Sequence, residues 1–111
     1  METREIPRQS WTSYLNSLSD TEKQHPIKLE ATGEDVGDEV ITERMPLYAI
    51  SIDEKGSDAG FIEVMLGQDE PVMSHRIEGA AHIYVEEEGG KVEAIDIEDR
   101  DNNKTVIQFL H

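Results

Sequence analysis

The apolar residues change from a helical to a strand period within residues 10–32, which read SWTSYLNSLSDTEKQHPIKLEAT. The first half spaces its large side chains at i, i+3, i+4 and i+7, the pattern of one helix face. These side chains are Trp11, Tyr14, Leu15 and Leu18. Ser10 stands where an N-cap belongs, and His25 is disfavoured in a helix because Pro26 follows it. We therefore expect an amphipathic helix near residues 10–23.

From Ile27 onward, apolar and polar residues alternate, which is typical of strands with one buried face. Short polar turn signals separate the alternating segments, so an antiparallel arrangement without crossover helices is favoured. The expected strands are 27–32, 48–53, 61–66, 82–88, 91–99 and 104–110, and the expected turns are 53–60, 78–80, 87–91 and 99–104. Residues 33–46 fit either a strand interrupted at Gly37 or a long loop.

These periods predict an α+β fold with an N-terminal amphipathic helix packed on a mainly antiparallel β-meander sheet. A chain of 111 residues is long enough for one core, so we expect a single domain over residues 1–111. Residues 1–25 would form the lead-in and helix, and residues 26–111 the strands. One amphipathic helix cannot bury its apolar face alone, which is why we place it on the sheet.

The composition excludes several classes of protein. There is no cysteine, hence no disulfide framework, thiolate zinc site or cysteine nucleophile. No apolar run approaches the roughly twenty residues of a membrane span, and the N-terminal segment lacks the apolar core of a signal peptide. We therefore expect a cytoplasmic protein.

The charge is strongly asymmetric, with 25 acidic residues, 10 basic residues and a formal net charge of −15. All of the excess lies in residues 29–111, because the first 28 residues are neutral. A negative field repels phosphate groups, so binding to nucleic acid or to an anionic membrane is not expected. The remaining interpretations are a basic protein partner, a salt-rich cytoplasm, or acids that keep a small protein soluble.

Residues 75–82, HRIEGAAH, contain two histidines placed symmetrically about Glu78 and Gly79. A two-residue hairpin turn at Glu78-Gly79 would place His75 opposite His82, close enough for both rings to reach one metal ion. Glu63 or Glu86 would have to complete such a site. Two imidazoles are one or two ligands short of a usual zinc site, so we predict neighbouring histidines that bind no metal.

No motif in the chain points to a known catalytic chemistry. There is no GxSxG elbow, glycine-rich phosphate loop or HExxH pattern. Residues 99–104 begin like a calcium loop, but Lys104 and Leu110 stand where that loop needs glycine and glutamate. Adjacent carboxylates such as those of residues 86–88 are expected by chance in so acidic a chain. We therefore expect no enzyme activity and no cofactor.

Several stretches together resemble a bacterial family of small proteins known as domain of unknown function 5335. They are REIPRQSW at 4–11, MPLYAISID at 45–53, IEVMLG at 62–67, HRI at 75–77 and TVIQF at 105–109. The resemblance covers nearly the whole chain and implies a bacterial, stand-alone, single-domain protein, but no established activity. It is stronger around His75 than around His82.

Two hypotheses about function follow, and we favour the first. The first is a non-catalytic interaction module that presents an acidic face to a basic protein, as a small acidic inhibitor or nucleic-acid mimic would. The second is a small metal-dependent hydrolase or metal-binding protein built on His75 and His82. A flat acidic face would support the first hypothesis, and a pocket lined by both histidines would support the second.

Overall fold

The computed structural model describes residues 2–34, 37–53 and 60–110, which form one α-helix and eight strands. The expected turn at 53–60 lies mostly outside these residues. The elements are β1 Glu2–Glu5, a 3-10 turn Arg8–Ser10, α1 Trp11–Thr21, β2 Pro26–Gly33, β3 Gly37–Asp53, β4 Phe61–Leu66, β5 Met73–Glu78, β6 Ala80–Glu88, β7 Lys91–Asp99 and β8 Lys104–Phe109. The α+β class with an antiparallel sheet is confirmed, since every pair of neighbouring strands is antiparallel.

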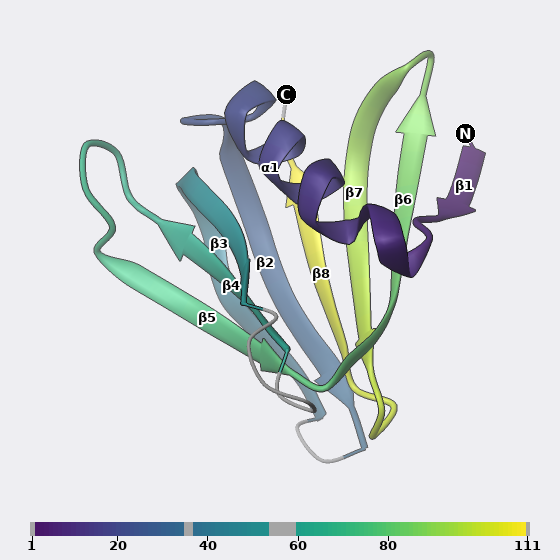
Figure 1. The fold of residues 1–111 in the computed structure, drawn as a ribbon. Helices are drawn as coiled ribbons and strands as arrows, with labels where there is room; N and C mark the ends of the chain where they lie inside the picture. Colours follow the sequence, from purple (N-terminus) through teal and green to yellow (C-terminus); the bar gives the residue numbers. More distant parts are fainter. Residues whose placement is uncertain (1, 35–36, 54–59, 111) are drawn as a thin grey trace.

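The sheet order is β1-β6-β7-β8-β2-β3-β4-β5, which differs from a simple meander. Two meanders, β2 to β5 and β6 to β8, lie side by side, and β8 pairs with β2. The chain therefore leaves β5 at one edge of the sheet and enters β6 near the other edge. Figure 1 shows this connection passing beneath the molecule from one group of strands to the other.

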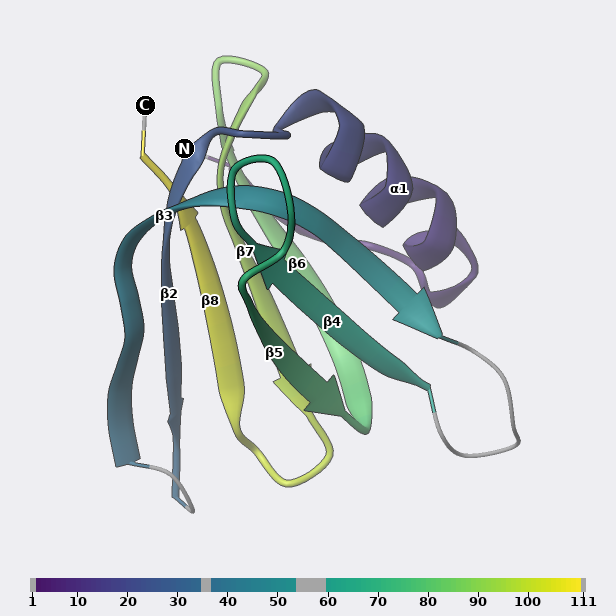
Figure 2. The ribbon, with the colours of Figure 1, turned by 90° about the vertical axis from the view of Figure 1, so that its left-hand side faces the viewer.

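The long strand β3 folds the sheet into two layers. Its residues 37–46 pair with β2, and its residues 47–53 pair with β4. Figure 2 shows β3 curving over from the layer of β2 and β8 to the layer of β4 and β5. Residues 37–46 are thus strand and belong to β3, whereas residues 35 and 36 lie outside the described part of the chain.

The core lies between these two layers. Val64 and Leu66 on one layer and Ile95 and Ile107 on the other are fully buried members of one continuous cluster. Each of these side chains follows the period-two pattern of its strand. Burial of β-branched and leucine side chains on both inner faces is the main force that holds the layers together.

Helix α1 packs on β3 and extends the core. Trp11, Leu15 and Leu18 are buried, and the indole Nε1 of Trp11 donates a hydrogen bond to the carbonyl of Ile6 over 3.0 Å. Ser10 occupies the N-cap position, but its side chain makes no capping hydrogen bond. The preceding 3-10 turn holds Ser10 in a helical conformation, so it lacks the extended backbone of an N-cap. Within the described residues, no helix is long and apolar enough to cross a membrane.

Candidate functional site

The predicted hairpin at Glu78-Gly79 is wrong, and the two histidines do not face each other. Only Gly79 separates β5 from β6, and one residue cannot close an antiparallel hairpin. Gly79 does adopt the expected positive φ of 68°, but it turns the chain from one layer to the other. His75 therefore pairs with Val64 on β4, and His82 pairs with Glu98 on β7.

His75 lies on the inner face of β5, because its partner Val64 belongs to the core. The ring is half-buried, and this burial lowers the pKa of His75 below its usual value, against the attraction of Glu39. Burial disfavours the charged imidazolium, since water solvates it better than the protein interior does. His75 is thus a partly buried edge residue.

His82 lies on the opposite, outer face of the sheet, next to Glu5 of β1. Its Nδ1 is 2.8 Å from Glu5 Oε2, and its ring stacks on Tyr84 with centroids 5.9 Å apart. The hydrogen bond to Glu5 raises the pKa of His82, and the charges of Glu5 and Glu98 act in the same direction. Neither Glu63 nor Glu86 joins the two histidines, and the described residues hold no group of three or more metal-ligating side chains. A metal site shared by His75 and His82 is therefore not favoured.

The outer face of β1, β6 and β7 carries a concentration of carboxylates. Register places Glu5 beside Tyr84, Tyr84 beside Asp96, and Glu98 between His82 and Lys104. Alternation adds Glu86, two residues beyond Tyr84 on β6. We call this surface the outer acidic face and define it by Glu5, Glu86, Asp96 and Glu98.

Asp96 is the electrostatic centre of the outer acidic face. Partial burial raises the pKa of Asp96, and the nearby charges of Glu86 and Glu98 raise it further, whereas Lys104 lowers it. A raised carboxyl pKa means that the negative charge is unfavourable where the fold places it. A cation brought to this face would relieve that repulsion.

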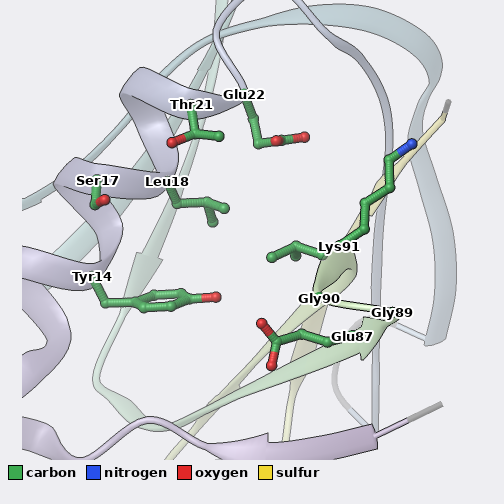
Figure 3. A pocket seen from close by; sticks show the side chains of 10 residues that line it. Tyr14, Ser17, Leu18, Thr21, Glu22, Glu87, Gly89, Gly90 and Lys91 are labelled. Atoms are coloured by element: carbon green, nitrogen blue, oxygen red, sulfur yellow. The ribbon is translucent and has the colours of Figure 1, made fainter.

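On the other side of the sheet, a pocket of about 370 Å³ lies between α1 and the β6–β7 hairpin. Figure 3 shows Tyr14, Leu18 and Glu22 extending from the helix side toward Glu87 and Gly90 of the hairpin. Gly89 and Gly90 have φ of 58° and 81°, the positive values that a tight hairpin turn requires. The expected turn at 87–91 is thus present, and it forms one wall of the pocket.

Polar atoms of this pocket are buried without hydrogen-bond partners. The Tyr14 hydroxyl and Glu22 Oε1 accept or donate no hydrogen bond within the described part of the chain. Glu22 is 8 % exposed, and Oε1 lies 3.4 Å from Nδ1 of His25 in a long ion pair. Glu87 receives a hydrogen bond from Nε of Arg4 over 3.1 Å.

The sequence did not point to this pocket. Tyr14 and Leu18 were expected as core residues of the helix, and Glu87 belonged to a run of acids that carried no signal. Glu87 lies two and four residues beyond the buried Val85 and Ile83, so it belongs to the same inner face of β6, where a charged residue is unusual. Its proximity to Glu22 depends on where the helix packs, which no local pattern encodes.

Comparison with known proteins supports a relationship over the full chain. Residues 2–111 match the model of a family of unknown function, DUF5335. An uncharacterised protein of Aquifex aeolicus (strain VF5) is 31% identical over 109 residues, which cover 98% of this chain and 93% of the relative. No solved structure shows a significant match to this chain.

Proposed function

Because the chain belongs to DUF5335, a family of unknown function, we propose a function from its surface: a cytoplasmic, non-catalytic binding protein whose outer acidic face contacts a basic protein. The resemblance noted in the sequence motifs is confirmed, but it assigns no activity. The proposal therefore depends on the chemistry of this chain alone.

The observation that carries the proposal is the half-buried carboxylate of Asp96 between Glu86 and Glu98. Its raised pKa reflects burial and the repulsion of those neighbours, and Lys104 compensates only in part. A lysine or arginine of a partner would lower the free energy of all three carboxylates when it binds. Complementary charge of this kind also accelerates the encounter of two proteins.

The regular backbone beneath this face supports the same function. Glu5, Tyr84 and Asp96 occupy neighbouring positions on β1, β6 and β7, held in antiparallel register. Side chains on paired strands keep fixed separations, so the carboxylates present a preformed pattern to a partner. Less conformational entropy is then lost on association.

Binding of a synthetic ten-residue peptide rich in lysine and arginine tests this proposal. The triple variant Glu86→Gln, Asp96→Asn, Glu98→Gln should weaken peptide binding at least tenfold in 0.1 M sodium chloride, where the Debye length is about 10 Å, measured by calorimetry with the full chain. A matched control carries Asp20→Asn, Asp38→Asn and Asp69→Asn, three exposed acids elsewhere, and changes the net charge equally.

The control triple should change the peptide affinity by no more than about threefold, since screening weakens charges beyond a Debye length. Equal weakening by both triples would contradict the proposal, because the peptide would then respond only to net charge. Unchanged affinity in the first triple would contradict it as well.

A further inference from the structure

The pocket between α1 and the β6–β7 hairpin has the dimensions of a small-molecule site. Its volume of about 370 Å³ falls within the roughly 300–1,000 Å³ that such sites occupy. Leu18 and Val92 supply apolar walls, and the ring of Tyr14 lies beside them (Figure 3). A ligand that fills it therefore needs an apolar body.

Two polar atoms that point into the pocket have no hydrogen-bond partner within the described residues. Buried polar atoms in folded proteins are nearly always hydrogen-bonded, and each exception needs an explanation. Here the Tyr14 hydroxyl and Glu22 Oε1 are such exceptions, and they extend in the same direction, toward the hairpin (Figure 3). Glu22 is 8 % exposed over the whole residue and 11 % over its side chain, and its ion pair with His25 does not provide a hydrogen bond to Oε1.

The side chains that line the pocket carry more negative than positive charge, and Arg4 pairs with one of the two carboxylates, that of Glu87. The carboxylates of Glu22 and Glu87 line the pocket, whereas the ammonium of Lys91 points away from it in Figure 3. Burial raises the pKa of the Tyr14 hydroxyl, and the charges of Glu87 and Glu22 raise it further, with Arg4 opposing them. An anionic ligand would meet this repulsion, whereas a cation would be attracted.

We propose that this pocket binds one organic cation, an alkyl ammonium group whose nitrogen donates hydrogen bonds to Glu87 and the Tyr14 hydroxyl, while the carboxylate of Glu22 lies farther along the pocket and attracts the positive charge. The alkyl part packs against Leu18 and Val92. An ammonium has three donors, which suffice for the Tyr14 hydroxyl and for Glu87. This site goes beyond the proposed function, because it lies on the helix side of the sheet and the outer acidic face lies on the other.

The ammonium can belong to a free alkylamine or to a lysine side chain, and two probes separate these sources. The first probe is n-butylammonium, and its neutral control is 1-butanol. The second is Nα-acetyl-lysine N-methylamide, and its neutral control is the same compound acetylated at Nε. Amide chemical shifts of the full-length chain in ¹H–¹⁵N NMR spectra report binding, above all at Leu18, Gly89 and Gly90.

We expect saturable shifts at these amides with both cations and none with either neutral control. A lysine derivative that binds at least tenfold more tightly than n-butylammonium supports a lysine side chain as the source. Equal or weaker binding of the lysine derivative supports a free amine. Equal binding of 1-butanol and n-butylammonium would overturn the site, as would calcium or magnesium binding there in place of the amine.

Two variants test the residues, so that a folding defect in one leaves the other informative. Glu22→Gln should weaken n-butylammonium binding about tenfold, which corresponds to about 1.4 kcal/mol. Tyr14→Phe should weaken it several-fold. Asp20→Asn is the matched control, since Asp20 is an exposed residue of the same helix and the charge change is the same as in Glu22→Gln.

Asp20→Asn should leave the affinity for n-butylammonium within about twofold of the parent chain, because the lost charge is exposed and screened. Equal weakening by Asp20→Asn and Glu22→Gln would overturn the proposal, because the amine would then respond to the general field of the protein. Full affinity in both pocket variants would overturn it too.

Discussion

At the scale of single residues, unsatisfied buried oxygens concentrate in one place. Within the described chain they are the Tyr14 hydroxyl, Glu22 Oε1 and Asn103 Oδ1. Asn103 packs so closely on Gly33 that a Cβ there would lie 2.1 Å from its Oδ1, so tight packing accounts for its position. Tyr14 and Glu22 have no such explanation, and both line the pocket between α1 and the hairpin. The proposed ammonium would supply the hydrogen bond that the Tyr14 hydroxyl lacks there.

Replacing Tyr14 by phenylalanine should stabilise the ligand-free protein. An unsatisfied buried hydroxyl costs about 1–3 kcal/mol, and the substitution removes it while keeping the ring. We expect the melting temperature of Tyr14→Phe to rise by a few degrees, measured by circular dichroism. Tyr48→Phe, at a half-buried tyrosine outside the pocket, serves as the control and should change it little. A lower melting temperature for Tyr14→Phe would mean that the hydroxyl is satisfied in solution.

The two histidines should titrate on opposite sides of the usual pKa of about 6.5. His82 should titrate above it, because its hydrogen bond to Glu5 favours the imidazolium. Its contribution to stability is then complete below 6.5 and is lost as the pH rises through its raised pKa. His75 should titrate below 6.5 because it is half-buried, so stability is lost as the pH falls from 6.5 toward its lowered pKa.

NMR titration of the two imidazole rings tests these values. The variant Glu5→Gln should lower the pKa of His82 and leave that of His75 unchanged, since His75 lies on the other face of a different strand. Identical titration of both rings near 6.5 would contradict the assignment. The expected depression of the His75 pKa follows from burial of its ring.

At the scale of helices and strands, the sequence predicted most elements and missed their assembly. The helix, β4 and β7 follow directly from their apolar periods, because each buries one face. β1 could not be predicted, since all of its residues are exposed and its partner β6 is remote in sequence. The pairing of β5 with β4 instead of β6 depends on Gly79, a single residue whose turn connects layers rather than neighbouring strands.

One part of the candidate site could be predicted from local sequence patterns, and the other part depends on contacts between distant segments. Alternation along β6 and β7 already separates the acids of the outer face from the core residues. The pocket could not be predicted, because it requires the helix to pack near the β6–β7 hairpin. Packing of the helix depends on the summed burial of many side chains, which leaves no mark at any one position.

The turn between β4 and β5 should depend strictly on Gly67. Its φ is 150°, and an added Cβ would lie 2.0 Å from the carbonyl oxygen of Glu70. Because a backbone atom must move, we expect Gly67→Ala to lower the free energy of unfolding by about 3 kcal/mol or more, measured with urea. Gly79→Ala is the comparison, since its Cβ would meet only Arg100 Nε at 3.9 Å. It should cost about 1–2 kcal/mol for its left-handed conformation; equal costs would contradict the clash at Gly67.

At the scale of the whole molecule, two opposing effects meet in the sheet. The inner faces of both layers bury a continuous apolar cluster, which stabilises the fold. The outer face of β1, β6 and β7 gathers carboxylates around Asp96, which destabilises it. The net charge of −15 adds a general self-repulsion to this local one. Stability should therefore depend on ionic strength more than in a neutral domain of this size.

We expect the melting temperature to rise as sodium chloride increases from 0.01 M to 0.1 M, because the Debye length falls from about 30 Å to about 10 Å.

Asp96→Asn should raise the melting temperature at low salt and reduce its salt dependence. The direction of this effect on stability follows from the raised pKa of Asp96, because its ionised form is less favourable in the folded state than in the unfolded state. The free energy of unfolding therefore falls as the pH rises through that pKa, and it is lowest when Asp96 is charged. Asp20→Asn changes the net charge equally at an exposed helix position and should have the smaller effect. A flat or falling curve for the parent chain would mean that its carboxylates are already compensated. Equal effects of the two variants would assign the repulsion to the whole molecule rather than to the outer acidic face.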